Sequence, residues 1–149
     1  MQTAIELSIE NARAGAGPFA ALVVKDGAIL ATGVNHVTSA LDPTAHAEIV
    51  AIRAACQMIR DFRLTGCELY STCEPCPMCM GAIYWARLDK VYYAGRRADA
   101  AQAGFDDSLI YDELARPLED RKIPMVPMMR SEALAAFREW ERSQTKIQY

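Results

Sequence analysis

The sequence has no hydrophobic run long enough to cross a membrane, although 52% of its 149 residues are hydrophobic. A membrane-spanning helix needs about 20 consecutive apolar residues, so we expect no such helix. The first six residues also lack the basic and apolar regions of a secretory signal peptide. These absences predict a cytoplasmic protein with no membrane partner.

An excess of positive charge is also missing. The chain has 16 Lys and Arg against 19 Asp and Glu, which gives a net charge of −3. Proteins that hold a phosphate backbone usually carry a basic face or stripe. The balance therefore favours a small uncharged substrate over nucleic acid, although charge alone does not exclude RNA.

Histidine is scarce, and the cysteines do not suit a disulfide framework. The chain has two histidines and five cysteines, an odd number. Three of the five lie at intervals of three residues: Cys73, Cys76 and Cys79. Such spacing is typical of metal binding in a reducing compartment. No repeat or linker divides the chain, so residues 1–149 are expected to form one domain.

Two short motifs carry the chemistry: residues 46–48 (His-Ala-Glu) and residues 75–79 (Pro-Cys-Pro-Met-Cys). One imidazole and two thiolates are one ligand short of a closed tetrahedral zinc site, which leaves a position for water. Zinc lowers the pKa of such a water toward neutrality, and Glu48 is the nearby carboxylate that can carry protons. His-x-Glu followed by Pro-Cys-x-x-Cys is the signature of zinc-dependent nucleobase deaminases. The predicted zinc ligands are His46, Cys76 and Cys79.

The remaining cysteines need an assignment, because Cys73 and Cys76 also form a Cys-x-x-Cys pair. Cys76 and Cys79 share a face in the first turn of a predicted helix, whereas Cys73 ends a strand. We therefore treat Cys73, Cys56 and Cys67 as small packing residues. The alternative is that Cys73 is a fourth ligand, which would make the zinc site structural.

The pattern of apolar residues and turn signals predicts an α/β fold with a mixed sheet of about five strands and helices on its faces. Asp42 and Pro43 suit the start of the helix that carries His46. Pro124 and Pro127 place the last strand at an edge of the sheet. The predicted strands are residues 19–25, 28–34, 67–72, 90–94 and 123–128, and the predicted helices are residues 1–12, 42–59, a helix from 76, a short one after 108, and one near the C-terminus.

Several residues are candidates for contact with a substrate, and each has a structural alternative. Asn35 offers a donor and an acceptor that match the edge of a base, or it is a turn residue. Asp107 can accept from substrate N–H groups, or else Asp106 or Asp107 simply caps the following helix. Phe19 or Trp85 can stack on a flat base, although core packing is the ordinary role of such a tryptophan.

Together these motifs resemble the cytidine deaminase-like superfamily, and within it the bacterial guanine deaminases of the short zinc type. The resemblance covers nearly the whole chain. The motif at 103–108 and the terminal Tyr149 distinguish this sequence from the tRNA adenosine deaminases. The residues that carry it are 17–19, 42–48, 73–79, 81–86, 103–108 and Tyr149.

The resemblance implies a three-layer α/β/α sandwich and zinc-dependent hydrolysis of guanine to xanthine and ammonia, a step of purine metabolism. It implies that Asn35 holds the purine and that Asp107 reads its edge or assists proton transfer. It further implies a homodimer that exchanges a C-terminal segment of about residues 131–149, so that Tyr149 completes an active site. The alternatives are deamination of guanosine, cytosine or tRNA adenosine, or a non-catalytic zinc module.

Overall fold

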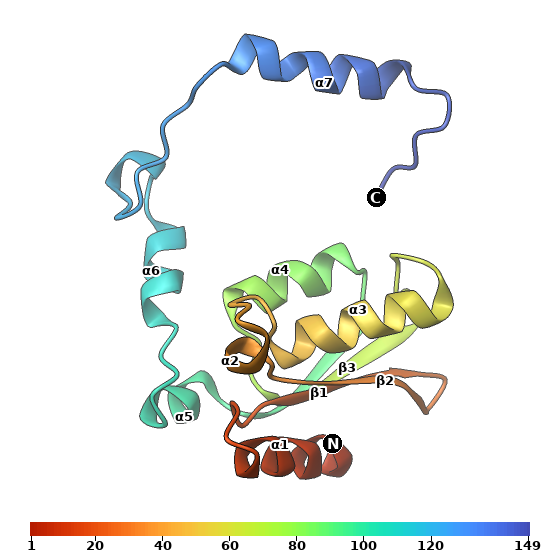
Figure 1. Ribbon diagram of the computed structural model, residues 1–149, viewed down its shortest axis with the longest axis vertical. Helices are drawn as coiled ribbons and strands as arrows, with labels where there is room; N and C mark the ends of the chain where they lie inside the picture. The colour runs from red at the N-terminus through yellow and green to blue at the C-terminus, as the bar shows by residue number, and fades with distance from the viewer. The chain divides into compact units, whose positions relative to one another are not determined.

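The computed structural model describes residues 1–149, which form two parts, Met1–Ser108 and Leu109–Tyr149. Each part is described by itself. Figure 1 shows the chain from its N-terminal helix to its C-terminal end.

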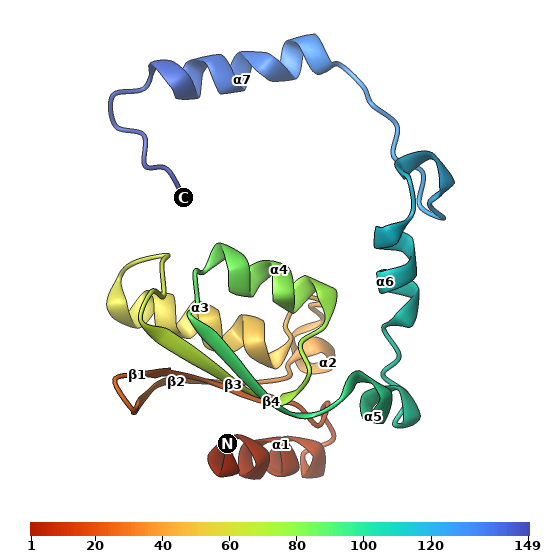
Figure 2. The same cartoon turned by 180° about the vertical axis from the view of Figure 1, so that it is seen from behind.

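A four-stranded mixed sheet forms the centre of the first part (Figure 2). The strand order is β2-β1-β3-β4, with β1 antiparallel to both of its neighbours and β3 parallel to β4. The mixed sheet confirms the predicted class, but it has four strands where about five were expected. The strands are β1 (Ala20–Lys25), β2 (Ala28–Val34), β3 (Cys67–Cys73) and β4 (Lys90–Gly95).

The predicted fifth strand, residues 123–128, is wrong. These residues form no strand, and they belong to the second part of the chain. Pro124 and Pro127 have no N–H to donate to a neighbouring strand. Two missing donors in six residues leave too few hydrogen bonds to hold an edge strand.

The first hairpin follows from its turn residues. Asp26 and Gly27 join β1 to β2, and both have positive φ, 50° and 78°. This is the combination that a two-residue type I′ turn requires. The bounds predicted for β2 from this turn are confirmed.

Helices cover both faces of the sheet, which gives the first part three layers (Figures 1 and 2). One face carries the N-terminal helix α1, and the other carries α3 and α4. Two short helices, α2 and α5, lie in the connections. The bounds are α1 (Gln2–Arg13), α2 (Val37–Ala40), α3 (Ala47–Ile59), α4 (Pro77–Trp85) and α5 (Arg97–Gln102).

The helix that carries the His-Ala-Glu motif starts later than predicted, at Ala47 instead of Pro43. The Asp42 side chain accepts bonds from the backbone N–H and the hydroxyl of Thr44, at 2.8 and 2.7 Å. Asp42 therefore closes a local turn ahead of the helix. His46 takes the N-cap position in an extended conformation, with φ −67° and ψ 154°.

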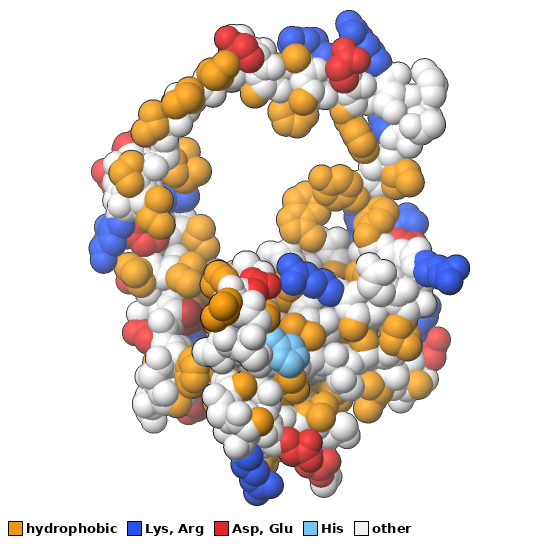
Figure 3. Space-filling model, viewed as in Figure 1, with side chains coloured by type: hydrophobic (Ala, Val, Ile, Leu, Met, Phe, Trp, Pro, Cys, Tyr) orange, Lys and Arg blue, Asp and Glu red, His pale blue; other side chains and the backbone are white.

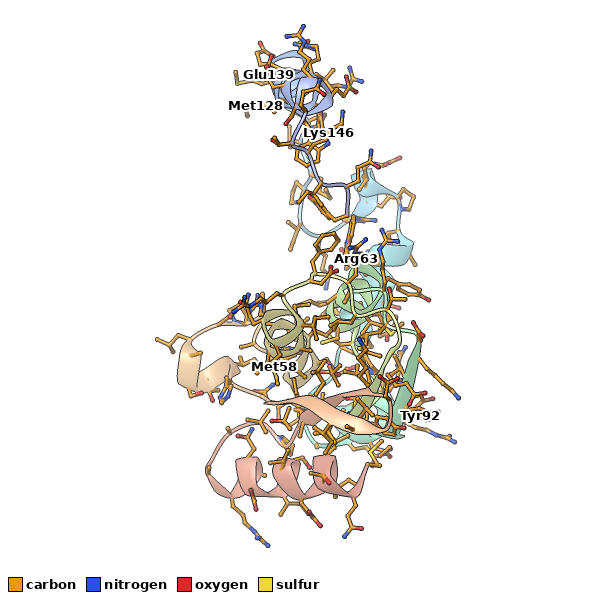
Figure 4. All side chains as sticks on the ribbon, turned by 90° about the vertical axis from the view of Figure 1, so that its right-hand side faces the viewer. Met58, Arg63, Tyr92, Met128, Glu139 and Lys146 are labelled. Atoms are coloured by element: carbon orange, nitrogen blue, oxygen red, sulfur yellow. The ribbon has the colours of Figure 1, made fainter.

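The core lies between the sheet and α3. Ala51 and Ala55 of the helix are fully buried against strand residues such as Val23 and Leu69. Met58, near the end of the same helix, is 64% exposed, so the last turn of α3 is not packed on that side (Figure 4). On the neighbouring strands β3 and β4, Tyr70 and Tyr92 stack with ring centroids 4.6 Å apart.

Close packing fixes where α3 begins. A Cβ added to Gly33 of β2 would lie 2.3 Å from the carbonyl oxygen of Ala47 and 2.5 Å from the backbone nitrogen of Ala51. Only glycine allows the first turn of α3 to approach the strand this closely. The start of α3, and with it the His-Ala-Glu motif, is therefore held directly against β2.

The second part contains α6, which begins at Ser108, a short 3-10 turn η1, and α7. None of residues 109–149 is buried. Hydrophobic side chains instead lie exposed along this part of the chain (Figure 3), including Phe137 at 63% and Trp140 at 44%. No helix anywhere in the chain is both long enough and apolar enough to traverse a bilayer. The bounds are α6 (Ser108–Ala115), η1 (Leu118–Asp120) and α7 (Arg130–Arg142).

Candidate active site

Three ligand atoms converge where α3 and α4 begin. The Nδ1 atom of His46 lies 3.5 Å from Sγ of Cys76 and 3.6 Å from Sγ of Cys79. All three ligand atoms lie within 4.8 Å of one another. His46 is the N-cap residue of α3 and Cys76 that of α4, and neither side chain makes a capping hydrogen bond. Both side chains therefore point to a common centre and not back along their own helices.

The spacing fits a zinc ion. Tetrahedral zinc binds nitrogen at about 2.0–2.1 Å and sulfur at about 2.3 Å, which places the two ligand atoms about 3.6 Å apart. The two observed nitrogen–sulfur distances, 3.5 and 3.6 Å, match this value. Cys73 is not part of the cluster, so the chain supplies three ligands here.

The charges of the cluster suit a cation. A hydrogen bond from the Cys79 thiol lowers the pKa of Cys76 to about 4, and the same contact raises the pKa of Cys79. The Cys76 thiolate in turn raises the pKa of His46. Zinc requires deprotonated sulfur and neutral imidazole, so it replaces these shared protons when it binds.

Glu48 lies beside the cluster and is almost fully buried, at 6% exposure. Its Oε1 accepts a hydrogen bond from the Ser71 hydroxyl at 3.1 Å, and its Oε2 accepts one from the Cys79 thiol at 3.5 Å. Burial raises the pKa of Glu48 above its usual value. A carboxyl group with a raised pKa can both accept and donate a proton near neutral pH.

A cavity of about 390 Å³ opens onto these groups. It is large enough for a single base, since small-molecule pockets start near 300 Å³. Most of the predicted site residues line it: Phe19, Asn35, His46, Glu48, Cys76 and Asp107. The cavity therefore places Phe19, Asn35 and Asp107 beside Glu48 and two of the three candidate metal ligands.

One predicted substrate contact of the first part does not line this cavity. Trp85 is 66% exposed, so it is not in the core, and no cavity contact supports a stacking role for it. Tyr149 belongs to the second part of the chain, so its role stays a prediction.

Asn35 is buried, and its surroundings hold it firmly. The backbone N–H of Val37 donates to its Oδ1 at 3.2 Å. The backbone oxygen of Asn35 accepts from the side-chain amide of Asn11 at 3.0 Å. The alternative reading as a turn residue is compatible with this geometry, because the bond to Val37 is an Asx-turn bond. Asn35 thus serves the turn and faces the cavity.

The two neighbouring aspartates divide their roles. Asp106 accepts from the backbone N–H and the hydroxyl of Ser108, at 2.9 and 3.0 Å, so it closes a local turn just before α6. Asp107 lines the cavity, and its pKa is raised first by burial and then by the negative charge of Cys76. Of the two aspartates, Asp107 is the one that lies on the cavity wall.

Sequence reasoning missed several cavity residues. Phe105 packs edge-on against Phe19, with ring centroids 4.9 Å apart and planes at 86°. Arg97 and Cys73 also line the cavity. Burial raises the pKa of Cys73 to about 11, which leaves it a neutral thiol. Phe105 lies within the 103–108 motif and could have been found there, but no sequence pattern singles out Arg97.

Comparison with known proteins identifies the family. Residues 1–95 match the family described as the cytidine and deoxycytidylate deaminase zinc-binding region. The chain therefore belongs to this family of zinc-binding deaminase domains.

Within this family, the chain is similar to particular deaminases. It is 51% identical to the guanine deaminase of Bacillus subtilis strain 168 over 100% of this chain and 96% of that protein. The X-ray structure of a Bacillus subtilis guanine deaminase covers 99% of this chain with a TM-score of 0.96. A tRNA-specific adenosine deaminase of Aquifex aeolicus is 45% identical, but the match covers only 54% of this chain and 53% of that protein.

Proposed function

We propose that this protein hydrolyses guanine to xanthine and ammonia, with a zinc ion held by His46, Cys76 and Cys79. The observation that carries the proposal is the buried Glu48 carboxyl beside a three-ligand cluster at the wall of a base-sized cavity. The full-length similarity to a guanine deaminase supports guanine as the substrate.

The chemistry divides between the metal and the side chains. Zinc, when bound, lowers the pKa of water so that a hydroxide nucleophile is available at neutral pH. Glu48 takes up the proton that water loses and delivers it to ring N3 as C2 is attacked. Glu48 then passes a second proton, from the added hydroxyl, to the amino group, which leaves as ammonia. The sum is guanine plus water giving xanthine plus ammonia.

Cavity residues orient the base. Asn35 holds the purine, and the carboxylate of Asp107 accepts hydrogen bonds from its N–H donors. Phe19 and Phe105 supply the apolar surface for the ring faces. A base without the matching donors would leave the Asp107 carboxylate unpaired in the closed cavity, which is a strong source of discrimination.

A panel of substrates tests this proposal. Ammonia release is measured with guanine, cytosine, guanosine, adenosine and tRNA, with and without a chelator. Guanine turnover that the chelator abolishes is expected, and Glu48→Gln should lower it by about 10²–10⁴-fold while zinc remains bound. Preference for tRNA or a nucleoside, or full activity of Glu48→Gln, would overturn the proposal.

The non-catalytic alternative has little support. A structural zinc site normally has four protein ligands, and Cys73 was the candidate for the fourth. Cys73 lies outside the cluster, and its Sγ instead contacts the backbone oxygen of Arg96 at 3.8 Å.

We also infer that the protein is a homodimer in which each chain contributes its C-terminal segment, about residues 131–149, to the other. Residues 109–149 bury none of their side chains, so they cannot form a core by themselves. An amphipathic segment of this kind gains stability only by packing on another surface. A second copy of the chain offers that surface, and Tyr149 then completes the partner's cavity.

Complementation between subunits tests this inference. Chains lacking Tyr149 keep Glu48, whereas Glu48→Gln chains keep Tyr149. Each should be inactive alone, and mixed dimers should regain activity at the sites that combine an intact Glu48 with the other subunit's Tyr149. A mixture as inactive as its components, with mixed dimers confirmed by mass, would contradict the exchange.

A further inference from the structure

The N-terminal helix α1 supplies no residue to the cavity wall, yet it is tied to that wall through one side chain. The side-chain nitrogen Nδ2 of Asn11 donates to the backbone oxygen of Gly17 at 2.7 Å and to that of Asn35 at 3.0 Å. These two bonds use both hydrogens of one amide group. Asn11 therefore joins the loop after α1 to the end of β2.

Gly17 of this loop also lies close to the side chain of Asn35. A Cβ added to Gly17 would lie 2.9 Å from Cγ of Asn35 and 3.0 Å from its Oδ1. Backbone bonds extend the same network, because Phe19 accepts from the N–H of Asn35 at 3.1 Å and donates its own N–H to Gly17 at 2.8 Å. Gly17, Phe19 and Asn35 all line the cavity.

We propose that Asn11 is a positioning residue for substrate binding, which sets the Asn35 side chain and the Gly17–Phe19 loop against the base. This inference rests on the proposed role of Asn35. Asn11 does not line the cavity, so it acts through these neighbours and not on the substrate.

The chemistry at this position requires an amide. Aspartate has the same shape but no hydrogen to donate, and leucine has a similar size but no polar group. Either replacement leaves two backbone oxygens without their donor and frees Asn35 to move. The zinc ligands and Glu48 lie on other elements, so the chemical step is preserved while the base is held less well. A change of this kind raises KM more than it lowers kcat.

The test uses the zinc-loaded, full-length protein and its kinetics with guanine. We expect Asn11→Leu and Asn11→Asp to raise KM about tenfold and to change kcat by less than about threefold. Ser8→Ala is the matched control, because Ser8 is buried on the same helix but bonds only to the backbone oxygen of Ile5. Ser8→Ala should leave KM unchanged. If it raises KM as much as the Asn11 variants do, Asn11 only stabilises α1 and does not position the substrate.

A double-mutant cycle separates positioning from an independent effect. If Asn11 acts through Asn35, Asn11→Leu adds little to the KM of an Asn35→Ala enzyme. If the KM of the double variant rises by the product of the two single-variant factors, the inference is overturned. If Asn11→Leu does not fold, Asn11→Asp replaces it in the cycle, because it keeps the shape of the side chain and removes only the donor.

Kinetics of the unmodified enzyme distinguish failure of this inference from failure of the proposed function. A parent that turns over guanine, with Asn11 variants of unchanged KM, refutes the role of Asn11 alone. A parent that turns over a different base of the panel refutes guanine as the substrate, and the same variants measured on that base still decide the role of Asn11.

Discussion

The hydroxyl of Ser71 donates a hydrogen bond to Oε1 of Glu48 across 3.1 Å, and both residues are buried. Ser71 lies on β3 and Glu48 in the first turn of α3, so this bond fixes the carboxyl group from the sheet beneath it. The next residue, Thr72, points to the opposite face of the strand, and its hydroxyl oxygen accepts from the backbone N–H of Ala20 at 3.0 Å.

We predict that Ser71→Ala lowers kcat about tenfold with little change in KM or zinc content. A hydrogen bond to a charged group contributes about 1.5–3 kcal/mol, and its loss leaves Glu48 less well oriented for proton transfer. Steady-state kinetics and metal analysis of the purified variant provide the measurement.

Two further variants control this prediction. Ser71→Thr retains the hydroxyl and should restore most of the kcat. Thr72→Ala removes a hydroxyl from the neighbouring position and should lower thermal stability without a selective loss of kcat. Equal kinetic defects in Ser71→Ala and Thr72→Ala would show that the effect comes from β3 as a whole.

Replacement of single cysteines should separate ligand from packing residue. Cys79→Ser is expected to lose zinc and activity, because its thiol is within 3.6 Å of the imidazole nitrogen of His46. Cys73→Ser should retain about one zinc per chain, since Cys73 lies outside the cluster. Zinc per chain is measured by atomic spectroscopy. Loss of zinc from Cys73→Ser would support the alternative that Cys73 is a fourth ligand of a structural site.

Gly33→Ala is expected to destabilise the protein by about 3 kcal/mol or more and to weaken zinc binding. Its methyl group meets the backbone of Ala47 and Ala51, so the start of α3 and with it His46 must shift. Gly81→Ala in α4 is the matched control, because no atom lies within 4 Å of its added Cβ. Denaturant unfolding should show Gly81→Ala to be more stable than the parent by about 0.5–1 kcal/mol.

The raised pKa of Glu48 predicts how stability depends on pH. Between the unfolded and the raised folded pKa, the folded state binds more protons than the unfolded state, so stability falls as pH rises through this interval. Glu48→Gln cannot ionise and escapes this loss. Thermal unfolding in excess chelator should therefore show an advantage for Glu48→Gln that is absent near pH 4 and grows toward neutrality. A difference that stays constant over this range is the contrary result.

The sequence predicts the local features well. The strands β1 to β4 and the zinc ligand set depend on turn residues and short spacings that are written within a few positions of each other. Asp42 shows the limit of such reasoning, because the same side chain can cap a helix or close a turn. In the structure Asp42 bonds to Thr44, and His46 takes the cap position in an extended conformation.

Features that depend on distant parts of the chain were not predicted. Ser71 and Glu48 are 23 positions apart, and Asn11 and Asn35 are 24 apart. Neither pair has a periodic or spaced signature, because the contacts arise only when a helix is docked on the sheet. Trp85 shows a related limit: its apolar character favours core packing, but its side chain is 66% exposed, and its contact with a substrate stays a prediction.

The first turns of α3 and α4 share one further property. His46 and Cys76 stand where a serine or an aspartate would ordinarily satisfy the free amide groups of a helix start, and neither side chain does so. An ion bound by both residues would instead tie the two helix starts together through their side chains. Loss of that ion should fray both helix starts at once and release Glu48 from its rigid frame. Cofactor depletion would then appear in hydrogen exchange as one coordinated opening at two places far apart in the chain.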